Sequence, residues 1–304
     1  MKVLGTGLTG LVGSRIAELL KDKYEFENVS RSSGIDVLDQ KSLFDFFKYS
    51  KSDIVVHFAA KTDVDGCEKD KEEDLRILDL KDEKEQNAEF KTKKTAWAIN
   101  VVGTKNVVNA CEQTGKRLIY ISTDFVFNGE KDFYTEDDES DPINWYGKTK
   151  YEGEKIVSSS EISWTILRIS YPYRANFARK DFARVLIDKL KNSERLKMIT
   201  DQIITPTFVD DLAGVLDYFF QNNMEGVYHA TGSDSLSPYD IARKISEIFG
   251  SDFNLIDKTT LTDFFEGRAR RPFHLALKND KIRKLGIEMM TFEEGLLQIK
   301  KEII

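Results

Sequence analysis

The chain has 304 residues, and its 52 acidic and 45 basic side chains give a formal net charge of −7. This length accommodates two domains or one large α/β unit. Hydrophobic residues make up 40% of the chain, enough to fill a sizeable core, which excludes a disordered protein. An isoelectric point near 5.3 argues against nucleic-acid binding, which depends on basic surfaces. Two cysteines exclude a disulfide framework and a four-thiolate zinc site.

Neither a targeting segment nor a membrane-spanning segment is expected. The first four residues lead directly into Gly5, so the apolar stretch of a signal peptide is missing. No apolar run approaches the roughly 20 residues of a spanning helix. We therefore expect a cytoplasmic protein with no membrane partner, in which Cys67 and Cys111 are thiols in a reducing compartment.

The first 170 residues alternate short apolar segments with longer amphipathic ones. Strands are expected at Lys2–Gly5, Tyr24–Ser30, Asp53–Ala60, Arg117–Ser122 and Trp164–Ile169. Helices are expected at Leu11–Lys21, Lys41–Lys48, Trp97–Thr114 and Tyr146–Val157. Strands that are apolar on both faces and alternate with helices indicate a parallel sheet covered on both sides. The predicted fold class is α/β, with a doubly wound parallel sheet of the Rossmann type.

The pattern is looser after residue 170. Helices are expected at Arg179–Leu190, Thr207–Phe220 and Pro238–Phe249, and a strand at Gly226–Ala230. Ser237 is the expected N-cap of the last helix, because Pro suits the first helical position. We expect residues 207–230 to rejoin the domain formed by residues 1–170. Residues 171–206 and 231–304 then form a smaller C-terminal α/β lobe.

The segment from Lys69 to Lys94 is unusually polar, with 17 charged residues among 26. This composition is typical of a solvated helical insertion. We expect a mobile element outside the core, whose deletion with a short linker leaves cofactor binding largely intact. A docking surface is the alternative interpretation.

A glycine motif links the first expected strand to the first expected helix. The sequence Gly5-Thr6-Gly7-Leu8-Thr9-Gly10 matches the G-x-G-x-x-G pattern. Glycines are needed there because the turn is tight and the backbone must approach a pyrophosphate closely. The helix amino end then offers free N–H groups to the phosphates. The motif therefore predicts a dinucleotide site.

The end of the second strand indicates which dinucleotide binds. An acidic residue about 20 positions after the glycines would bind the ribose 2′-hydroxyl of NAD, whereas an arginine accommodates the 2′-phosphate of NADP. Arg31 lies 21 residues after Gly10, and no Asp or Glu stands in that turn. Ser30 and Ser32 add hydroxyl donors. We expect NADP(H) as the cofactor, with NAD as the alternative.

Tyr146 and Lys150 are spaced i and i+4, which places them on one face of a helix. A cation one turn away, together with the positive nicotinamide, is expected to lower the pKa of the phenol. The phenol then exchanges a proton with a carbonyl oxygen as hydride is transferred. Ser122 and Thr123 end a buried strand, where ligands bind in doubly wound sheets.

These features together resemble an extended short-chain dehydrogenase/reductase, and more narrowly the dTDP-4-dehydrorhamnose reductases. The similarity covers most of the chain outside the charged insertion. The matching stretches are Phe58–Asp65, Ser122–Gly129, Tyr146–Glu154, Asn176-Phe177, Asp201–Thr207 and Arg271-Pro272. The chain departs from the family at Ile204, where Gly is usual, and this departure bears on the sugar pocket.

The resemblance implies roles for individual residues. Thr123, Tyr146 and Lys150 would be catalytic. The cofactor would contact Gly7, Gly10, Leu11, Val12, Arg31, Ser32, Asp36, Val37, Ala59, Ala60, Lys61, Asn100, Ser122, Tyr146 and Lys150. The substrate would contact Thr123, Asn176, Gln202 and Arg271. Residues 1–170 with 207–230 would bind the dinucleotide, and the C-terminal lobe would bind the substrate.

The implied activity is NADPH-dependent reduction of the C4 keto group of a nucleotide-linked 4-keto-6-deoxysugar. One alternative is an epimerase or dehydratase that retains its cofactor, but dehydratases carry a Glu where this chain has Phe125. Another is a non-catalytic NADP-binding subunit, since the regulatory β subunit of methionine adenosyltransferase resembles this family. The expected partner is a nucleotide-sugar, and the sequence leaves a homodimer open.

No metal site is expected. The three histidines lack metal-ligand spacing with the cysteines, and His57 is expected to be a packed strand residue. Asp63, Asp65 and Glu68 are the acidic residues that could attract a divalent cation, although a solvated loop is the simpler interpretation.

Overall fold

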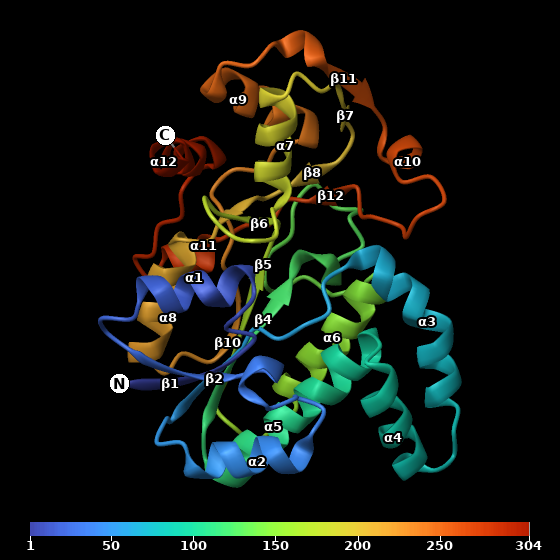
Figure 1. Cartoon of the computed structure of the whole chain (residues 1–304), viewed down its shortest axis with the longest axis vertical. Coiled ribbons are helices and arrows are strands. Elements are labelled where there is room, and N and C mark those ends of the chain that lie inside the picture. Colours follow the sequence, from blue (N-terminus) through green and yellow to red (C-terminus); the bar gives the residue numbers. More distant parts are fainter. Residues whose placement is uncertain (304) are drawn as a thin grey trace.

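A computed structural model describes residues 1–303, arranged as a larger and a smaller lobe (Figure 1). The larger lobe is built on a six-stranded sheet in the order β10-β5-β4-β3-β1-β2. Its strands are β1 (Lys2–Thr6), β2 (Glu25–Val29), β3 (Ile54–His57), β4 (Arg117–Thr123), β5 (Trp164–Ile169) and β10 (Gly226–His229). All neighbouring strands run parallel, which confirms the expected doubly wound α/β fold.

Helices cover both faces of this sheet. One face packs against α1 (Leu11–Leu19), α8 (Asp211–Gln221) and α11 (Asp280–Arg283). The other packs against α2 (Gln40–Tyr49), α5 (Gly103–Thr114) and α6 (Trp145–Ser158). In β3, Val56 contributes to the first core and Val55 to the second, because successive strand residues point to opposite faces. This two-sided burial explains the continuous apolar run of that strand.

The smaller lobe lies beyond the carboxyl ends of the strands (Figure 1). It has three two-stranded parallel ladders. These pair β6 (Pro172–Tyr173) with β9 (Thr207–Phe208), β7 (Leu196–Ile199) with β11 (Ile256–Thr259), and β8 (Ile203–Ile204) with β12 (His274–Leu275). Its helices are α7 (Phe182–Lys191), α9 (Pro238–Phe249), α10 (Leu261–Phe264) and α12 (Phe292–Ile303). Within residues 1–303, no helix is long and apolar enough to cross a membrane.

Two expected helices differ from the observed ones. The stretch expected as a helix from Thr207 begins as strand β9, and α8 starts only at Asp211, because the first two residues pair with β6. The single helix expected over Trp97–Thr114 contains a π-helical turn, η2 (Ala98–Val102), before α5. Such turns often occur at functional sites, where they redirect one side chain.

The charged segment at residues 69–94 is not outside the core, contrary to the expectation from composition. It forms most of α3 (Val64–Leu78) and all of α4 (Glu83–Lys93). Ile77 and Phe90 are 0% and 2% exposed, and they join the core beneath α2 and α5. The two helices therefore bury an apolar contact although most of their residues are solvated charges.

The acidic side chains of α3 also hold neighbouring backbone. Asp74 accepts hydrogen bonds from the Trp145 indole at 2.7 Å and the Trp97 backbone N–H at 3.1 Å. Glu68 accepts from the backbone N–H of Trp145 at 2.8 Å, at the start of α6. Asp70 accepts from the backbone N–H of Ala96 at 2.7 Å. Deletion of this segment would therefore remove structural contacts of α6 and η2.

We predict that Phe90→Ala lowers the free energy of unfolding by about 3–5 kcal/mol, because it removes a buried aromatic ring from the core. Leu75→Ala on the neighbouring helix α3 is the control, because Leu75 is 48% exposed and its loss should change stability by only about 0.5 kcal/mol. Urea unfolding followed by circular dichroism measures both. Equal midpoints for the two variants would contradict the packing described for α4.

Candidate functional site

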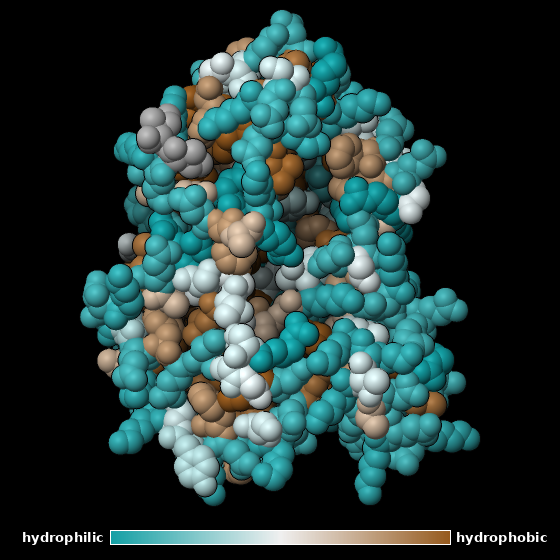
Figure 2. All heavy atoms as spheres, in the orientation of Figure 1, coloured by the Kyte–Doolittle hydropathy of each residue, from teal (hydrophilic) through white to brown (hydrophobic). Residues whose placement is uncertain are grey.

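A cleft of about 980 Å³ lies between the carboxyl ends of the sheet strands and the smaller lobe. Figure 2 shows the surface hollowed in the middle of the molecule, between the two lobes. Twelve of the residues expected in the site line this cleft: Gly7, Gly10, Leu11, Val12, Arg31, Ala60, Lys61, Ser122, Thr123, Tyr146, Lys150 and Arg271. Residues far apart in sequence thus meet in one space.

The glycine loop has the conformation that its sequence demands. Gly7 has φ +69°, and a Cβ atom there would lie 2.7 Å from the backbone nitrogen of Ala59. Gly10 is the N-cap of α1, and no side chain caps this helix. The backbone N–H groups of its first turn therefore remain available at the cleft wall, beside Leu11 and Val12.

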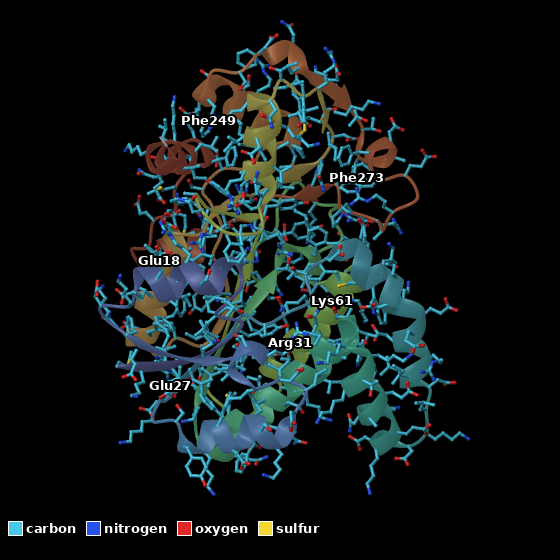
Figure 3. All side chains as sticks on the ribbon, viewed as in Figure 1. Glu18, Glu27, Arg31, Lys61, Phe249 and Phe273 are labelled. Carbon is cyan, nitrogen blue, oxygen red and sulfur yellow. The ribbon has the colours of Figure 1, made fainter. Side chains whose placement is uncertain are left out.

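Arg31 lines the cleft from the short helix η1 (Arg31–Ser33) after β2, as does Lys61 from the loop after β3 (Figure 3). In the part of the chain that the structure describes, no carboxylate forms an ion pair with Arg31. Three other residues expected at the cofactor, Ser32, Asp36 and Val37, are not among the residues that line the cleft. Asp36 pairs with Lys94 at 3.0 Å, and Val37 is buried.

Ala59, Lys61 and Asn100 are joined to the rest of the site through hydrogen bonds. The backbone N–H of Ala59 donates to the Thr6 hydroxyl at 3.2 Å. The Asn100 side chain accepts from the Lys61 N–H at 2.8 Å and donates to the Lys61 carbonyl at 3.0 Å. The same amide donates to the Thr149 hydroxyl on α6 at 2.9 Å. Asn100 is fully buried and holds the loop and helix rather than lining the cleft.

Tyr146 and Lys150 lie in the first turns of α6, and Thr123 ends β4. Asn144 caps α6 by accepting from the Gly147 N–H at 2.9 Å. A Cβ atom on Gly147 would collide with the Phe125 carbonyl oxygen, so glycine lets the helix start pack directly against the strand end. The Thr123 hydroxyl donates to the Asp124 carboxylate at 2.9 Å.

Burial dominates the titration of the two helix residues. It raises the pKa of Tyr146 above its usual range, although a hydrogen bond with Thr123 opposes the shift. It also lowers the pKa of Lys150 to about 7. The Lys150 ammonium donates to the Ile121 carbonyl at 2.8 Å and lies 4.0 Å from the centre of the Tyr120 ring. Without bound cofactor, burial therefore determines the direction of the Tyr146 pKa shift.

The substrate residues expected in the smaller lobe occupy different positions. Arg271 lines the cleft, whereas Gln202 is 2% exposed behind it and donates to the Pro272 carbonyl at 3.0 Å. Asn176 is exposed, and the next residue, Phe177, lines the cleft instead. Ile204 is buried in the core of the lobe and does not shape the pocket directly.

Asp65 and Glu68 serve as partners for protein groups. Asp65 accepts from Arg271 at 2.7 Å and from Arg268 at 2.8 Å, and the ion pair with Arg271 is the main cause that lowers its pKa to about 2. Glu68 caps α6 as described above. Across residues 1–303, no group of three His, Cys, Asp or Glu side chains is arranged to hold a metal ion.

Two further residues, Asp124 and Tyr171, line the cleft. Tyr171 has φ +41°, a left-handed conformation that a bulky residue adopts only under constraint from its surroundings. Asp124 is 1% exposed, accepts from the Ser170 hydroxyl at 2.6 Å, and has its pKa raised to about 6 by burial. Its position directly after Thr123 was the only sequence signal, and Tyr171 offered none.

Comparison with known proteins gives consistent results across the chain. The RmlD substrate binding domain model matches residues 1–84 and 81–304. The spore coat polysaccharide biosynthesis protein SpsK of Bacillus subtilis is 30% identical, over 99% of this chain and 97% of that protein. The dTDP-4-dehydrorhamnose reductase of Bacillus anthracis, solved in complex with NADP, is 29% identical with a TM-score of 0.85 and 99% coverage of both chains. The dTDP-4-dehydrorhamnose reductase of Clostridium acetobutylicum is 30% identical, also with a TM-score of 0.85, and the match covers 100% of this chain and 99% of that one. This chain belongs to the RmlD substrate binding domain family.

Proposed function

We propose that this protein is an NADPH-dependent reductase of the C4 keto group of a nucleotide-linked 4-keto-6-deoxysugar. The observation that carries the proposal is the meeting of the glycine loop, Arg31, Thr123 and Tyr146 in one cleft. Two solved structures named as dTDP-4-dehydrorhamnose reductases, one of them in complex with NADP, support the same activity.

The residues of the larger lobe fit a phosphorylated dinucleotide. The closely packed Gly7 and the uncapped start of α1 match the needs of a pyrophosphate. Arg31 would bind the 2′-phosphate. The Ser122 hydroxyl is buried at the cleft wall without a protein partner among the described residues, so it offers the cofactor a hydrogen-bonding group. We assign dinucleotide binding to residues 1–170 with 207–230.

The proton transfer is assigned to Tyr146. When bound, NADPH would supply the hydride for C4 of the sugar. Tyr146 donates its phenolic proton to the carbonyl oxygen, which becomes the hydroxyl of the product. Burial suits this direction of reaction, because a raised pKa keeps the phenol protonated before the transfer. Thr123 would orient the same carbonyl oxygen once its hydroxyl hydrogen turns from the Asp124 carboxylate toward that oxygen.

Lys150 would hold the cofactor ribose and stabilise the phenolate that remains after proton transfer. Its ammonium lies among the strand-end carbonyls and the Tyr120 ring, so little water screens its charge. We assign substrate binding to residues 171–206 and 231–304, where Arg271 presents a cation to the cleft. Asn176 and Gln202 would act indirectly on the substrate side of the cleft. Asn176 precedes the cleft residue Phe177, and Gln202 holds the Pro272 carbonyl next to Arg271.

The two alternative activities differ from the reductase in testable ways. Phe125 packs edge-on against Tyr146 with ring centres 5.6 Å apart, and its side chain has no titratable group for a dehydratase step. A regulatory subunit would bind NADPH without turnover and form a stable complex with a larger enzyme.

The decisive experiment mixes the protein with NADPH and dTDP-4-keto-6-deoxy-L-mannose and follows the loss of NADPH absorbance. A series of related keto sugars is tested in the same way.

The choice of cofactor gives the next prediction. NADPH should bind more tightly than NADH, and Arg31→Ala should narrow the difference by about 10- to 100-fold, the range for a charged hydrogen bond of about 1.5–3 kcal/mol. Lys41→Ala, an exposed cation on α2 paired with Asp45, is the control and should change nothing. Fluorescence titration measures the affinities. Equal affinities of the unmodified protein for the two cofactors would refute the assignment.

Tyr146→Phe should lower the rate of reduction by about 10²- to 10⁴-fold, the usual contribution of general acid–base catalysis. Folding and NADPH affinity should change little, because the ring remains and only one oxygen is lost. Tyr151→Phe, one turn later on α6, should retain full activity. Near-normal turnover by Tyr146→Phe would show that another group supplies the proton.

The pKa of Lys150 predicts a pH dependence. The value of kcat/KM for NADPH should fall as the pH rises through about 7, because Lys150 then loses its proton and its charge. Lys150→Met should have low kcat/KM throughout and lack this step. Steady-state kinetics between pH 5.5 and 9 test the prediction, and a step retained by Lys150→Met would assign it to another group.

A further inference from the structure

His57, the last residue of β3, is a buried histidine that the proposed chemistry does not use. The residue is 1% exposed and its ring lies between two hydroxyl groups. Nδ1 is 2.5 Å from Thr6 Oγ1, and Nε2 is 3.1 Å from Thr104 Oγ1. Burial, helped by the nearby Lys150 charge, lowers the pKa of His57 to about 3. The ring is therefore neutral, with one nitrogen that donates and one that accepts.

The neighbouring groups decide which nitrogen carries the hydrogen. Thr104 Oγ1 donates its only hydrogen to the Asn100 backbone carbonyl at 2.7 Å, so it can only accept from Nε2–H. Nδ1 must then accept from Thr6 Oγ1, which itself accepts from the Ala59 N–H. The opposite tautomer would leave the Nε2 lone pair facing an oxygen with no hydrogen to give, a costly arrangement in a buried site.

The chain of hydrogen bonds continues to the helix of the site. The Asn100 amide holds both backbone groups of Lys61 and donates to the Thr149 hydroxyl. Thr149 in turn donates to the backbone carbonyl of Tyr146 at 2.9 Å. Thr6, Asn100, Thr104 and Thr149 are all at most 1% exposed, so water cannot substitute for their partners. A continuous buried network thus connects β1 with α6.

We propose that His57 is a positioning residue: as the Nε2–H tautomer, it links the strand that leads into the glycine loop to the helix that carries Tyr146. The positioning role of His57 rests on the proposed function, whereas the tautomer of its ring can be tested independently of that function. The network fixes the distance between the segment that would hold the cofactor and the phenol. A displacement of about 1 Å in such a geometry can cost up to about 10²-fold in rate.

The tautomer is tested directly by long-range ¹H–¹⁵N spectroscopy of protein labelled at histidine, without cofactor, with signals assigned through His57→Gln and His229→Gln. His57 should show the Nε2–H form unchanged from pH 8 to pH 5. His229 is the internal control, because it should show the opposite tautomer. Its Nδ1 faces the Lys278 carbonyl oxygen at 3.0 Å and must donate a hydrogen bond to it. An Nδ1–H form or an imidazolium at His57 would overturn the proposal.

The positioning role is tested with Thr104→Val, which removes the hydroxyl that His57 donates to but keeps the side-chain shape. We expect kcat to fall by about 10- to 100-fold and NADPH to bind several-fold more weakly. Thr104→Ser, which keeps the hydroxyl, should restore most of both. Thr165→Val is the control, because Thr165 is equally buried on β5 but donates to the Met224 carbonyl away from the cleft.

The outcomes separate this inference from the proposed function. If no keto sugar is reduced, the tautomer and the NADPH affinities of the three variants still test the network. If Thr104→Val loses stability as Thr165→Val does but retains kcat and NADPH affinity, the network is merely structural and the positioning role is refuted. A selective loss in Thr104→Val with rescue by Thr104→Ser supports it.

Discussion

The Asn100 carboxamide holds together the segments on which the site depends. Its oxygen and nitrogen bind both backbone groups of Lys61, and the nitrogen also reaches Thr149 on α6. Only an amide offers an acceptor and two donors without a charge that burial would penalise. Asn100 lies within the π-helical turn η2 and is fully buried there. The loop that follows β3 and helix α6, which both line the cleft, are therefore joined by direct hydrogen bonds in the protein without ligand.

Local patterns were sufficient to predict the parts of the site that depend on local geometry. The glycine loop follows from the close approach of Gly7 to the backbone of Ala59, and the shared position of Tyr146 and Lys150 on α6 at the cleft follows from helical periodicity. Composition does not reveal that the charged segment packs against the core, because its two buried apolar residues, Ile77 and Phe90, stand among many charged ones. The partners of Asp74 are distant in sequence, with Trp145 71 residues away, so composition carried no sign of them.

Burial also explains why helical spacing alone does not predict the Tyr146 pKa of the protein without cofactor. A helical turn fixes which groups are close, but desolvation depends on everything packed around them. The same burial raises the pKa of Asp124 to about 6. Its carboxyl stabilises the fold while protonated, and this contribution, of the order of 3 kcal/mol, is lost as the pH rises through about 6. At neutral pH the cleft thus keeps an unfavourable charge, as functional sites often do.

The ion pairs of Asp65 make the contact between α3 and the smaller lobe depend on the ionic strength of the solution. One carboxylate on α3 holds two arginines from the opposite side of the cleft, with Arg271 only 6% exposed and Arg268 47% exposed. Dissolved salt screens the exposed contact far more than the buried one. Added salt is therefore expected to weaken the contact of Arg268 with Asp65 before the contact of Arg271.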